Sequence, residues 1–519
     1  MSTLPQDTAP PVAPAPAPDQ RLHPWSWLFV MLMQLRQFLL PLVALLVFGG
    51  RGDRDEMWTY LTTLIVIAVL VAISILQYLT YRYHIGHDAI SVRSGIIARN
   101  RREIPFARIH NVVVHQNPLH RLFGVAELRL ESAGGHRPEA EMRVLKLSQA
   151  LALEQLVRQR GQQPPPLPDA GDAAAVLHSA PSTAAPAAVL LQLGNRDVLR
   201  IGLLSNRGWV AVLAAWGASY QFFPRGYVSD AVEHHGREVF GYASHLHPAT
   251  WVWVVAAVFT VGGFWLLLRL LSVVLALLRY HGFQLTEQER RLTVTSGLLT
   301  RMRTSVARRR IQAWTLRETA LQRWVGRRQL RIDNAAGVGS DDDGRDLREL
   351  APLATPAACD DLLRHLLPRL QWPPPRWQGV ARRGWWRLCL PALVVVPLLS
   401  VGAVFEVGPW GAVLLAWLPW SAFRASREIA RMGYYLDGDY VAVRGGWWTR
   451  WWRLAELDKL QSLRLSRSPL DRMLGTASVW LDTAGAGGSI ALRLRFLPES
   501  EARGVLKTLN QALARRRLR

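Results

Sequence analysis

An arginine follows a glycine at the same spacing in three distant parts of the chain. Gly95, Gly297 and Gly446 are each followed four residues later by an arginine, and the residue six positions after the glycine is arginine twice and tryptophan once. Residues two apart on a strand point to the same face, so the two side chains of each pair would project together. Paired guanidinium groups suit phosphate, so these faces are candidate sites for anionic lipid headgroups or a partner; a solvated basic strand is the alternative interpretation. The pairs are Arg99 and Arg101, Arg301 and Arg303, and Arg450 and Trp452.

A longer repeated pattern surrounds each of these pairs. In every copy a second glycine follows the first after 29 residues, and a basic residue and a leucine lie between them at fixed offsets. Agreement without gaps at this many positions indicates three homologous domains. We expect the glycines to supply turns and the leucines, Leu119, Leu321 and Leu470, to lie in the core. The other framework residues are Gly95, Arg108 and Gly124, then Gly297, Arg310 and Gly326, then Gly446, Lys459 and Gly475.

The residues around the repeats predict strands followed by one helix. In the first copy, short β-branched runs alternate with polar residues and break at glycine-containing turns, which is typical of antiparallel strands. An apolar stripe then predicts a helix over 147–160, and similar stripes close the other two copies. We therefore expect three small domains of antiparallel strands, each closed by a carboxyl-terminal helix.

The composition places these domains in a membrane protein. The chain has 519 residues, 50% of them hydrophobic, with 22 tryptophans and a formal net charge of +23. Long apolar runs in a basic chain indicate an inner-membrane protein with basic cytoplasmic parts. The arginines are spread over three domains without an aromatic stacking pattern, so we expect no nucleic-acid partner.

Apolar segments occur in pairs, and one pair precedes each repeat. We expect about six spans in three helical hairpins, although the last two segments are short and contain prolines. Trp447, Trp448, Trp451 and Trp452 either anchor the third domain at the membrane interface or pack across its strands. The predicted order is a disordered tail (1–20), a hairpin (21–80), a domain (81–160), a linker (161–188), a hairpin (189–278), a domain (279–370), a hairpin (371–425) and a domain (426–519).

The charges predict the orientation of the spans. The loops inside the hairpins, 51–56, 224–247 and the turn at Glu406, carry a net charge of −3, so the rest of the chain carries +26. Because positive residues remain on the cytoplasmic side, both termini and all three domains should be cytoplasmic.

Residue patterns typical of enzymes are not found in the sequence. No phosphate-binding loop, nucleophile elbow or zinc-protease helix occurs. His110, His115 and His120 are five residues apart, a spacing that aligns them on neither a helix nor one strand face. We therefore expect no catalytic residues, no cofactor and no bound metal.

The repeated elements resemble the bacterial pleckstrin-homology (PH)-like domain family in its multi-domain, membrane-anchored form. The resemblance rests on the apolar hairpin, the Ser-Gly turn followed by two Ile or Leu residues, the basic–apolar pair such as Arg108–Ile109, and the Leu-x-Arg-x-x-Gly element. It implies a partly open sandwich of about seven strands capped by a helix, three times over. The third copy departs most, because GGWWTRWW replaces its aliphatic strand.

These observations favour a non-enzymatic membrane scaffold. Its PH-like domains would bind anionic lipid headgroups, a membrane-protein partner or a second copy of the chain, in a role such as envelope maintenance. A membrane transporter or transporter accessory subunit is the alternative. Apart from Arg36 and Arg269, however, the spans are nearly free of the ionisable residues that line transport pathways.

Overall fold

The computed structural model describes most of the repeats and the helices beside them. The described residues are 20–21, 26–29, 31, 56–86, 89–95, 100–132, 140–160, 187–222, 234, 250–334, 348–483 and 490–517. They divide into two units, the first with one repeat and the second with the other two. The predicted tail and most of the predicted linker lie outside the described residues, as do Arg99 and most of the first predicted span.

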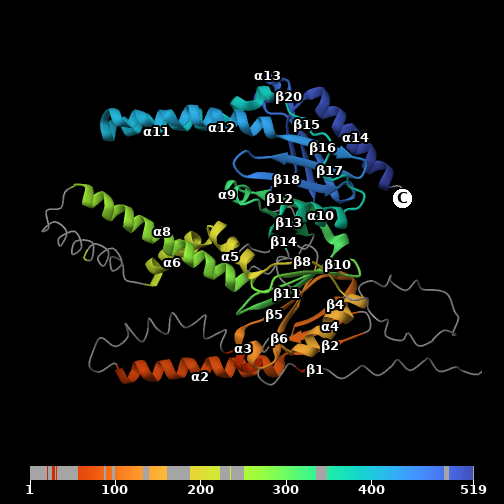
Figure 1. Ribbon diagram of the computed structural model, residues 1–519. Helices are drawn as coiled ribbons and strands as arrows, with labels where there is room; N and C mark the ends of the chain where they lie inside the picture. The colour runs from red at the N-terminus through yellow and green to blue at the C-terminus, as the bar shows by residue number, and fades with distance from the viewer. Residues whose placement is uncertain are drawn as a thin grey trace, which may run out of the picture. The chain divides into compact units, whose positions relative to one another are not determined.

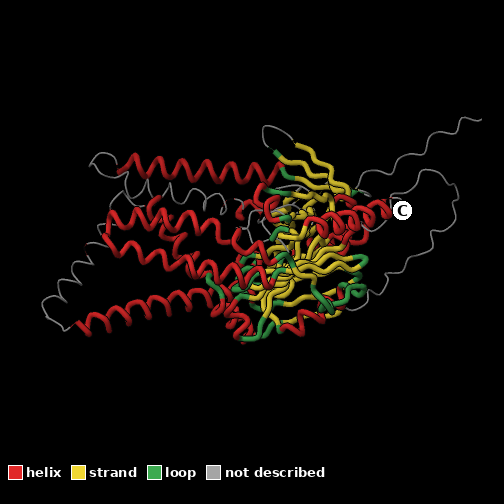
Figure 2. Tube along the Cα trace, turned by 90° about the horizontal axis from the view of Figure 1, so that it is seen from above, coloured by secondary structure: helices red, strands yellow, loops and turns green. Residues whose placement is uncertain are grey.

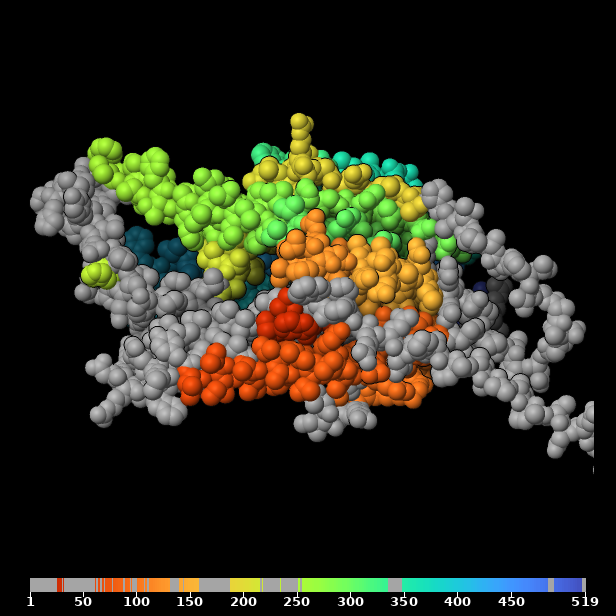
Figure 3. All heavy atoms as spheres, turned by 90° about the horizontal axis from the view of Figure 1, so that it is seen from below, coloured from red at the N-terminus to blue at the C-terminus, as the bar shows by residue number. Residues whose placement is uncertain are grey.

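The first repeat consists of two antiparallel meanders joined by a short 3-10 turn, η1 (Phe106–Arg108). In the second meander Val114 lies opposite Leu128 and Val112 opposite Leu130, and all four side chains are buried in one core. Helix α2 extends beyond these strands, as Figure 3 shows in orange-red. The elements are β1 (Gln20–Arg21), α2 (Glu56–Thr80), β2 (Arg82–Ile85), β3 (Ala89–Ser94), β4 (Asn100–Pro105), β5 (Ile109–Gln116), α3 (Pro118–Leu122), β6 (Val125–Ser132), β7 (Ala140–Lys146) and α4 (Leu147–Arg160).

The second repeat has the same order of elements. Strand β8 pairs with β9, β9 with β10 and β10 with β11, and a 3-10 turn, η2 (Arg308–Arg310), leads into the second meander. The elements are β8 (Ala188–Gln192), α5 (Asn195–Leu204), α6 (Arg207–Phe222), α8 (Thr250–Tyr280), β9 (Gln284–Gln288), β10 (Arg291–Ser296), β11 (Arg301–Ala307), β12 (Ile311–Glu318), α9 (Ala320–Trp324), β13 (Arg328–Asn334), β14 (Glu349–Ala354) and α10 (Pro356–Leu366).

The third repeat shares a sheet with the second. Strand β12 pairs antiparallel with β18, which joins the two meanders into one seven-stranded sheet of order β14-β13-β12-β18-β17-β16-β15. The last meander, β19-β20-β21, forms a separate three-stranded sheet. The elements are β15 (Gln378–Gly379), η4 (Arg382–Gly384), α11 (Trp385–Val407), η5 (Gly408–Ala416), α12 (Trp417–Arg431), β16 (Gly433–Asp437), β17 (Tyr440–Gly445), β18 (Arg450–Glu456), η6 (Leu457–Lys459), β19 (Leu460–Ser466), α13 (Pro469–Leu474), β20 (Thr476–Thr483), β21 (Arg493–Pro498) and α14 (Glu499–Arg517).

Each repeat begins with a strand that precedes its apolar helices. Strand β8 comes before α5, α6 and α8, yet it pairs with β9, which follows them. Strands β15 and β16 flank α11 and α12 in the same way, and β1 and β2 flank α2. The helices are therefore an insertion between two neighbouring strands of one sheet, a connection that the sequence did not predict.

Two stretches among the described residues are long and apolar enough to cross a membrane, so the expectation of about six spans is met only in part. They are Val254–Tyr280 and Arg382–Arg431. The second stretch reverses direction at Gly408, so its two halves contact each other. The Ser400 hydroxyl donates to the carbonyl of Gly411, and Cys389 lies beside the carbonyl of Ser421. In the second unit, α8 and the α11–α12 hairpin extend from the strands on the same side (Figures 1 and 2).

Candidate functional site

Glycines with positive φ place the turn that precedes the candidate arginines. Gly95, Gly297 and Gly446 have φ of 114°, 113° and 77°. A Cβ atom on Gly297 or Gly446 would lie 1.9 Å from the carbonyl oxygen of Thr300 or Thr449. The turn therefore requires glycine, and the residue four positions later opens β11 or β18.

The candidate arginines of the first two repeats lie in different surroundings. Arg101 is exposed and donates to Glu103 over 2.6 Å, so its charge is already paired within β4. Arg301 is exposed at the start of β11, whereas Arg303 is half-buried. The two repeats do not present the same pair of accessible cations.

The candidate pair of the third repeat lies in an internal strand. Arg450 is opposite Glu318 of β12, and the Trp452 ring lies between two guanidinium groups, 4.6 Å from that of Arg328 and 5.3 Å from that of Arg431. Cation–π contacts of this kind stabilise packing. Trp452 is thus packed where the second and third repeats meet, and Arg450 lies on the same strand.

That junction contains a buried ion pair that the sequence did not identify. Arg453 of β18 is 0% exposed. One of its nitrogens donates to the Thr315 hydroxyl over 3.2 Å, and another lies 2.5 Å from a carboxylate oxygen of Asp333 in β13. Nearby, the Lys459 ammonium donates to the carbonyl of Arg309 over 2.8 Å. The sequence contained a sign of this ion pair, because Arg453 interrupts an otherwise apolar segment of β18.

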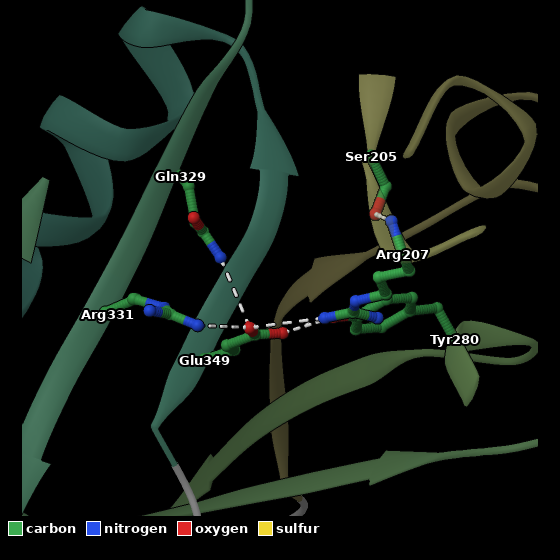
Figure 4. Close-up of polar contacts among 6 residues, drawn as sticks. All are labelled: Ser205, Arg207, Tyr280, Gln329, Arg331 and Glu349. Atoms are coloured by element: carbon green, nitrogen blue, oxygen red, sulfur yellow. Dashed lines mark hydrogen bonds and ion pairs between the residues drawn. The ribbon is translucent and has the colours of Figure 1, made fainter. Parts of the chain in front are cut away.

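A polar cluster fastens the helices of the second repeat to its strands (Figure 4). Arg207 opens α6 and donates to the hydroxyl of Tyr280 at the end of α8 over 2.7 Å, and Tyr280 in turn donates to Glu349 of β14. On the other side of Glu349, Arg331 donates over 2.8 Å and Gln329 over 3.3 Å. Burial favours the neutral carboxyl of Glu349, but Arg331, Arg279 and Arg207 hold its pKa below the usual value. One carboxylate thus ties two helices to the sheet.

Arg269, within the apolar stretch of α8, fastens this helix to the end of α5. Its guanidinium donates to the carbonyls of Leu203 and Ser205, each over 3.0 Å, at the carboxyl end of α5. A cation at this end of a helix satisfies carbonyls that have no partner in the helix. This arginine has a structural role.

The third repeat uses a different attachment. Arg387 of α11 donates to Asp471 and, over 3.2 Å, to the Ser468 hydroxyl at the start of α13. Asp471 also accepts from Thr476 over 2.9 Å and from the backbone of Ser468 over 2.9 Å. Burial opposes ionisation, but these donors and Arg387 hold the pKa of Asp471 below its usual value.

The short helices of the repeats expose apolar side chains. Leu119 and Leu321 are 45% and 47% exposed and Leu470 is half-buried, so the expectation that these leucines fill the core is wrong. The reason is that α3 and α9 are single turns whose apolar side chains point away from the sandwich. Trp324 of α9 and Met473 of α13 are 85% and 82% exposed.

The glycine turns lie beside these helices and beside the ends of the apolar helices. The backbone of Leu298 donates to the carbonyl of Leu278 at the end of α8 over 3.0 Å. Trp447 contacts Phe423 of α12 with ring centroids 5.4 Å apart, and its carbonyl accepts from Arg323 over 3.4 Å. Trp451 packs on the core, whereas Trp448 is exposed. We call the exposed apolar residues of the glycine turns and short helices in the second unit the apolar rim: Leu298, Leu299, Leu321, Trp324, Val325, Trp448 and Met473.

Within the part of the chain that the structure describes, no group of three His, Cys, Asp or Glu residues could hold a metal ion. Cys359 and Cys389 are free and buried. The polar side chains around Arg453, Glu349 and Asp471 bond to one another, which is an arrangement suited to holding elements together.

Comparison with known proteins agrees with this repeated architecture. The family described as "Bacterial PH domain" matches three times, over residues 35–161, 239–367 and 392–513. The UPF0699 transmembrane protein YdbT of Bacillus subtilis (strain 168) is 19% identical over 443 residues, which cover 84% of this chain and 86% of that protein. No solved structure matches significantly. The chain belongs to the bacterial PH domain family, with three such domains in a membrane-associated, YdbT-like protein.

Proposed function

We propose that this protein is a non-enzymatic scaffold that holds its PH-like domains against the cytoplasmic surface of the inner membrane. In this proposal the apolar rim lies in the membrane interface, exposed arginines face anionic headgroups, and the sheets present binding surfaces to protein partners. Both termini are cytoplasmic, in keeping with the excess of positive charge outside the hairpin loops.

The observation that carries the proposal is the apolar rim. Trp324 follows Arg323, which donates to the turn at Trp447 beside α12, and Met473 lies on α13, which Arg387 joins to α11. Solvent-exposed apolar groups in one patch mark an interaction site, and tryptophan is favoured at the membrane interface. Arg301, three residues beyond Leu298, is exposed and available to anionic headgroups.

The attachments between helices and strands support the scaffold role. Glu349 and Asp471 each hold the helices of one repeat to its domain, and β12 and β18 join two domains in one sheet. Domains held this firmly would keep a fixed height above the bilayer. Such constancy suits a platform that positions other molecules.

Site-specific fluorescence in the full-length protein tests the proposal. Trp324→Cys is introduced after Cys359 and Cys389 are changed to alanine, labelled with an environment-sensitive dye and placed in lipid nanodiscs. We expect a blue-shifted emission that brominated lipids quench, as for a group in the interface. The matched control is Arg364→Cys, an exposed position on α10 whose dye should remain in water. A water-like emission at both positions would refute the proposed placement.

A second fluorescence measurement tests whether anionic headgroups contribute to the placement of the rim. Nanodiscs with phosphatidylglycerol should deepen the shift at position 324 relative to phosphatidylcholine alone, and Arg301→Gln should reduce that difference. Equal shifts in both lipids would remove anionic headgroups from the proposal.

A further inference from the structure

Strand β4 occupies the same place in the first repeat as β18 does in the third. However, β4 lies at the edge of its sheet, whereas β18 is an internal strand. The sheet has the order β1-β2-β3-β4, and among the described residues of the first unit β4 pairs only with β3. Its first residues, Asn100 to Glu103, are exposed. An edge strand presents unpaired backbone N–H and C=O groups that can pair with another strand.

The side chains of β4 repeat the feature that the third repeat uses at its junction. Arg102 lies seven residues after Gly95, as Arg453 lies seven after Gly446. Arg102 is opposite Val92 and Arg453 opposite Val443, so both arginines occupy equivalent positions on their strand pairs. The second repeat has Thr304 at this offset, which shows that the domain fold does not require an arginine there.

The contacts of Arg453 indicate which residues a partner would need beside Arg102. The arginine meets the Thr315 hydroxyl on the adjacent strand and the Asp333 carboxylate one strand further. Arg102 is exposed and has no ion-pair partner within the described residues. An arginine in this position is complemented by a small hydroxyl residue and an acid on two neighbouring strands.

We propose that the edge of β4 is a docking site for a PH-like domain of a second membrane protein. The partner adds its own β12-like strand antiparallel to β4. It places a serine or threonine opposite Arg102 and an aspartate or glutamate on its next strand, so that the guanidinium becomes buried in the joint as Arg453 is.

The chain's own last sheet does not meet this requirement. Strand β19 corresponds to β12, and Asp482 of β20 corresponds to Asp333. The residue at the place of Thr315, however, is Arg464, which is exposed. If β19 of a second copy paired with β4 in the register of β12 and β18, Arg464 would lie opposite Arg102, and like charges in directly opposed positions are unfavourable. Arg464 therefore keeps copies of this chain from joining end to end.

The first test changes the edge strand β19 so that it meets the requirements of the proposed partner strand. The full-length protein with Arg464→Thr is purified in nanodiscs or mild detergent and weighed by native mass spectrometry beside the wild type. We expect the wild type to be monomeric and the variant to form dimers and longer chains. Arg464→Lys, the matched control, should stay monomeric, and adding Arg102→Glu or Asp482→Asn to Arg464→Thr should restore the monomer.

Assembly that ignores Arg102, or an Arg464→Thr variant that stays monomeric, would overturn the docking role of the β4 edge. A wild type that already forms chains would overturn the role of Arg464.

The second test identifies the occupant in native cells. A photoreactive amino acid replaces Glu103, and the adducts are mapped by mass spectrometry of the cross-linked peptides. We expect adducts with another PH-like protein, at the strand that follows its 3-10 turn, and their loss with Arg102→Glu. Adducts only with this chain, whether with a second copy or with residues 1–19, 32–55 or 161–186, or only with lipid, would contradict the proposal.

Discussion

Strands β12 and β19 occupy the same place in consecutive repeats and have opposite surroundings. Nearly every residue of β12 is buried, because β13 lies on one side and β18 on the other. Strand β19 pairs with β20 in a sheet where it is the outer strand, and Gln461, Ser462 and Arg464 are exposed. The comparison shows that the domain fold does not decide whether this strand is internal. The two strands differ at the position that faces Arg453 in the joint: β12 has Thr315 there, whereas β19 has Arg464.

The largest expected effect comes from breaking the buried joint. Arg453→Leu leaves the Asp333 carboxylate without its buried partner, and breaking one side of a buried ion pair costs about 3–5 kcal/mol. Hydrogen exchange should rise in β12 and β18, and the midpoint of urea unfolding should fall. Arg102→Leu is the matched control at the open edge, where we expect a change below about 0.5 kcal/mol. Similar effects at both positions would show that burial of the arginine adds no stability.

The next effect tests the turn that leads into the joint. Gly446→Ala forces a side chain into a conformation with φ of 77° and against the Thr449 carbonyl, so β18 should be displaced from β12. Backbone strain of this kind costs about 1–3 kcal/mol. Gly438→Ala, where a Cβ meets open space, is the control for thermal unfolding. Equal melting temperatures for the two variants would contradict the need for glycine at position 446.

An effect of comparable size separates attachment of the helices from the joint between domains. Glu349→Gln removes the charge shared by Arg207 and Arg331, which we expect to cost about 1–3 kcal/mol. Exchange should increase at the start of α6 and in β14 but not in β18. Because the pKa of Glu349 is lowered on folding, its contribution is present above the usual carboxyl pKa and is lost as pH falls through the folded value. Increased exchange in β18 would show that the two attachments are coupled.

The smallest effect concerns the first repeat, whose β4 edge is open. Burial lowers the pKa of His120 from 6.5 to about 4, so the neutral ring stabilises the fold above pH 6.5 and this stability is lost as pH falls toward 4. Between pH 7 and 5.5 we expect a loss of about 1 kcal/mol in the first repeat. His120→Phe should remove this dependence, and Arg102→Gln should leave it intact. Exchange in β5 and β6 as a function of pH measures both variants, and an unchanged profile for His120→Phe would assign the acid sensitivity elsewhere.

Glu127 should not contribute to the loss of stability between pH 7 and 5.5. Burial opposes its ionisation, but His115 and Arg129 outweigh that effect and hold its pKa at about 2. Its contribution is present above the usual carboxyl pKa and is lost only as pH falls toward 2. The two groups therefore act in different pH ranges.

The sequence predicted the features that depend on local residues. The repeated glycines, the strands between them and the closing helices follow from turns and periodicity within a few residues. The sharing of one sheet by two repeats could not be predicted in this way, since Arg453 and Thr315 are 138 residues apart in the chain. Strand β15 has only two residues and pairs with β16 across an intervening hairpin, so no local pattern reveals it.

The candidate site was predicted less well than the fold. Spacing placed Trp452 and Arg450 on β18, but it could not show that β12 covers this strand. Leu321 is expected in the core because apolar residues are usually buried, whereas it lies on α9, a single turn whose apolar side chains point away from the sandwich. Repetition identifies residues that belong to a domain, and only the neighbouring elements show which of those residues are accessible.

The insertion of apolar helices between paired strands has a consequence for biogenesis. During translation, β8 emerges from the ribosome before α6 and α8, and its partner β9 emerges only after them. The nascent domain cannot complete its sheet until α5, α6 and α8 have been made and β9 has reached β8. Closure of each such sheet thus follows synthesis of the helices between its two strands, and a chain interrupted before that point would leave an unpaired strand.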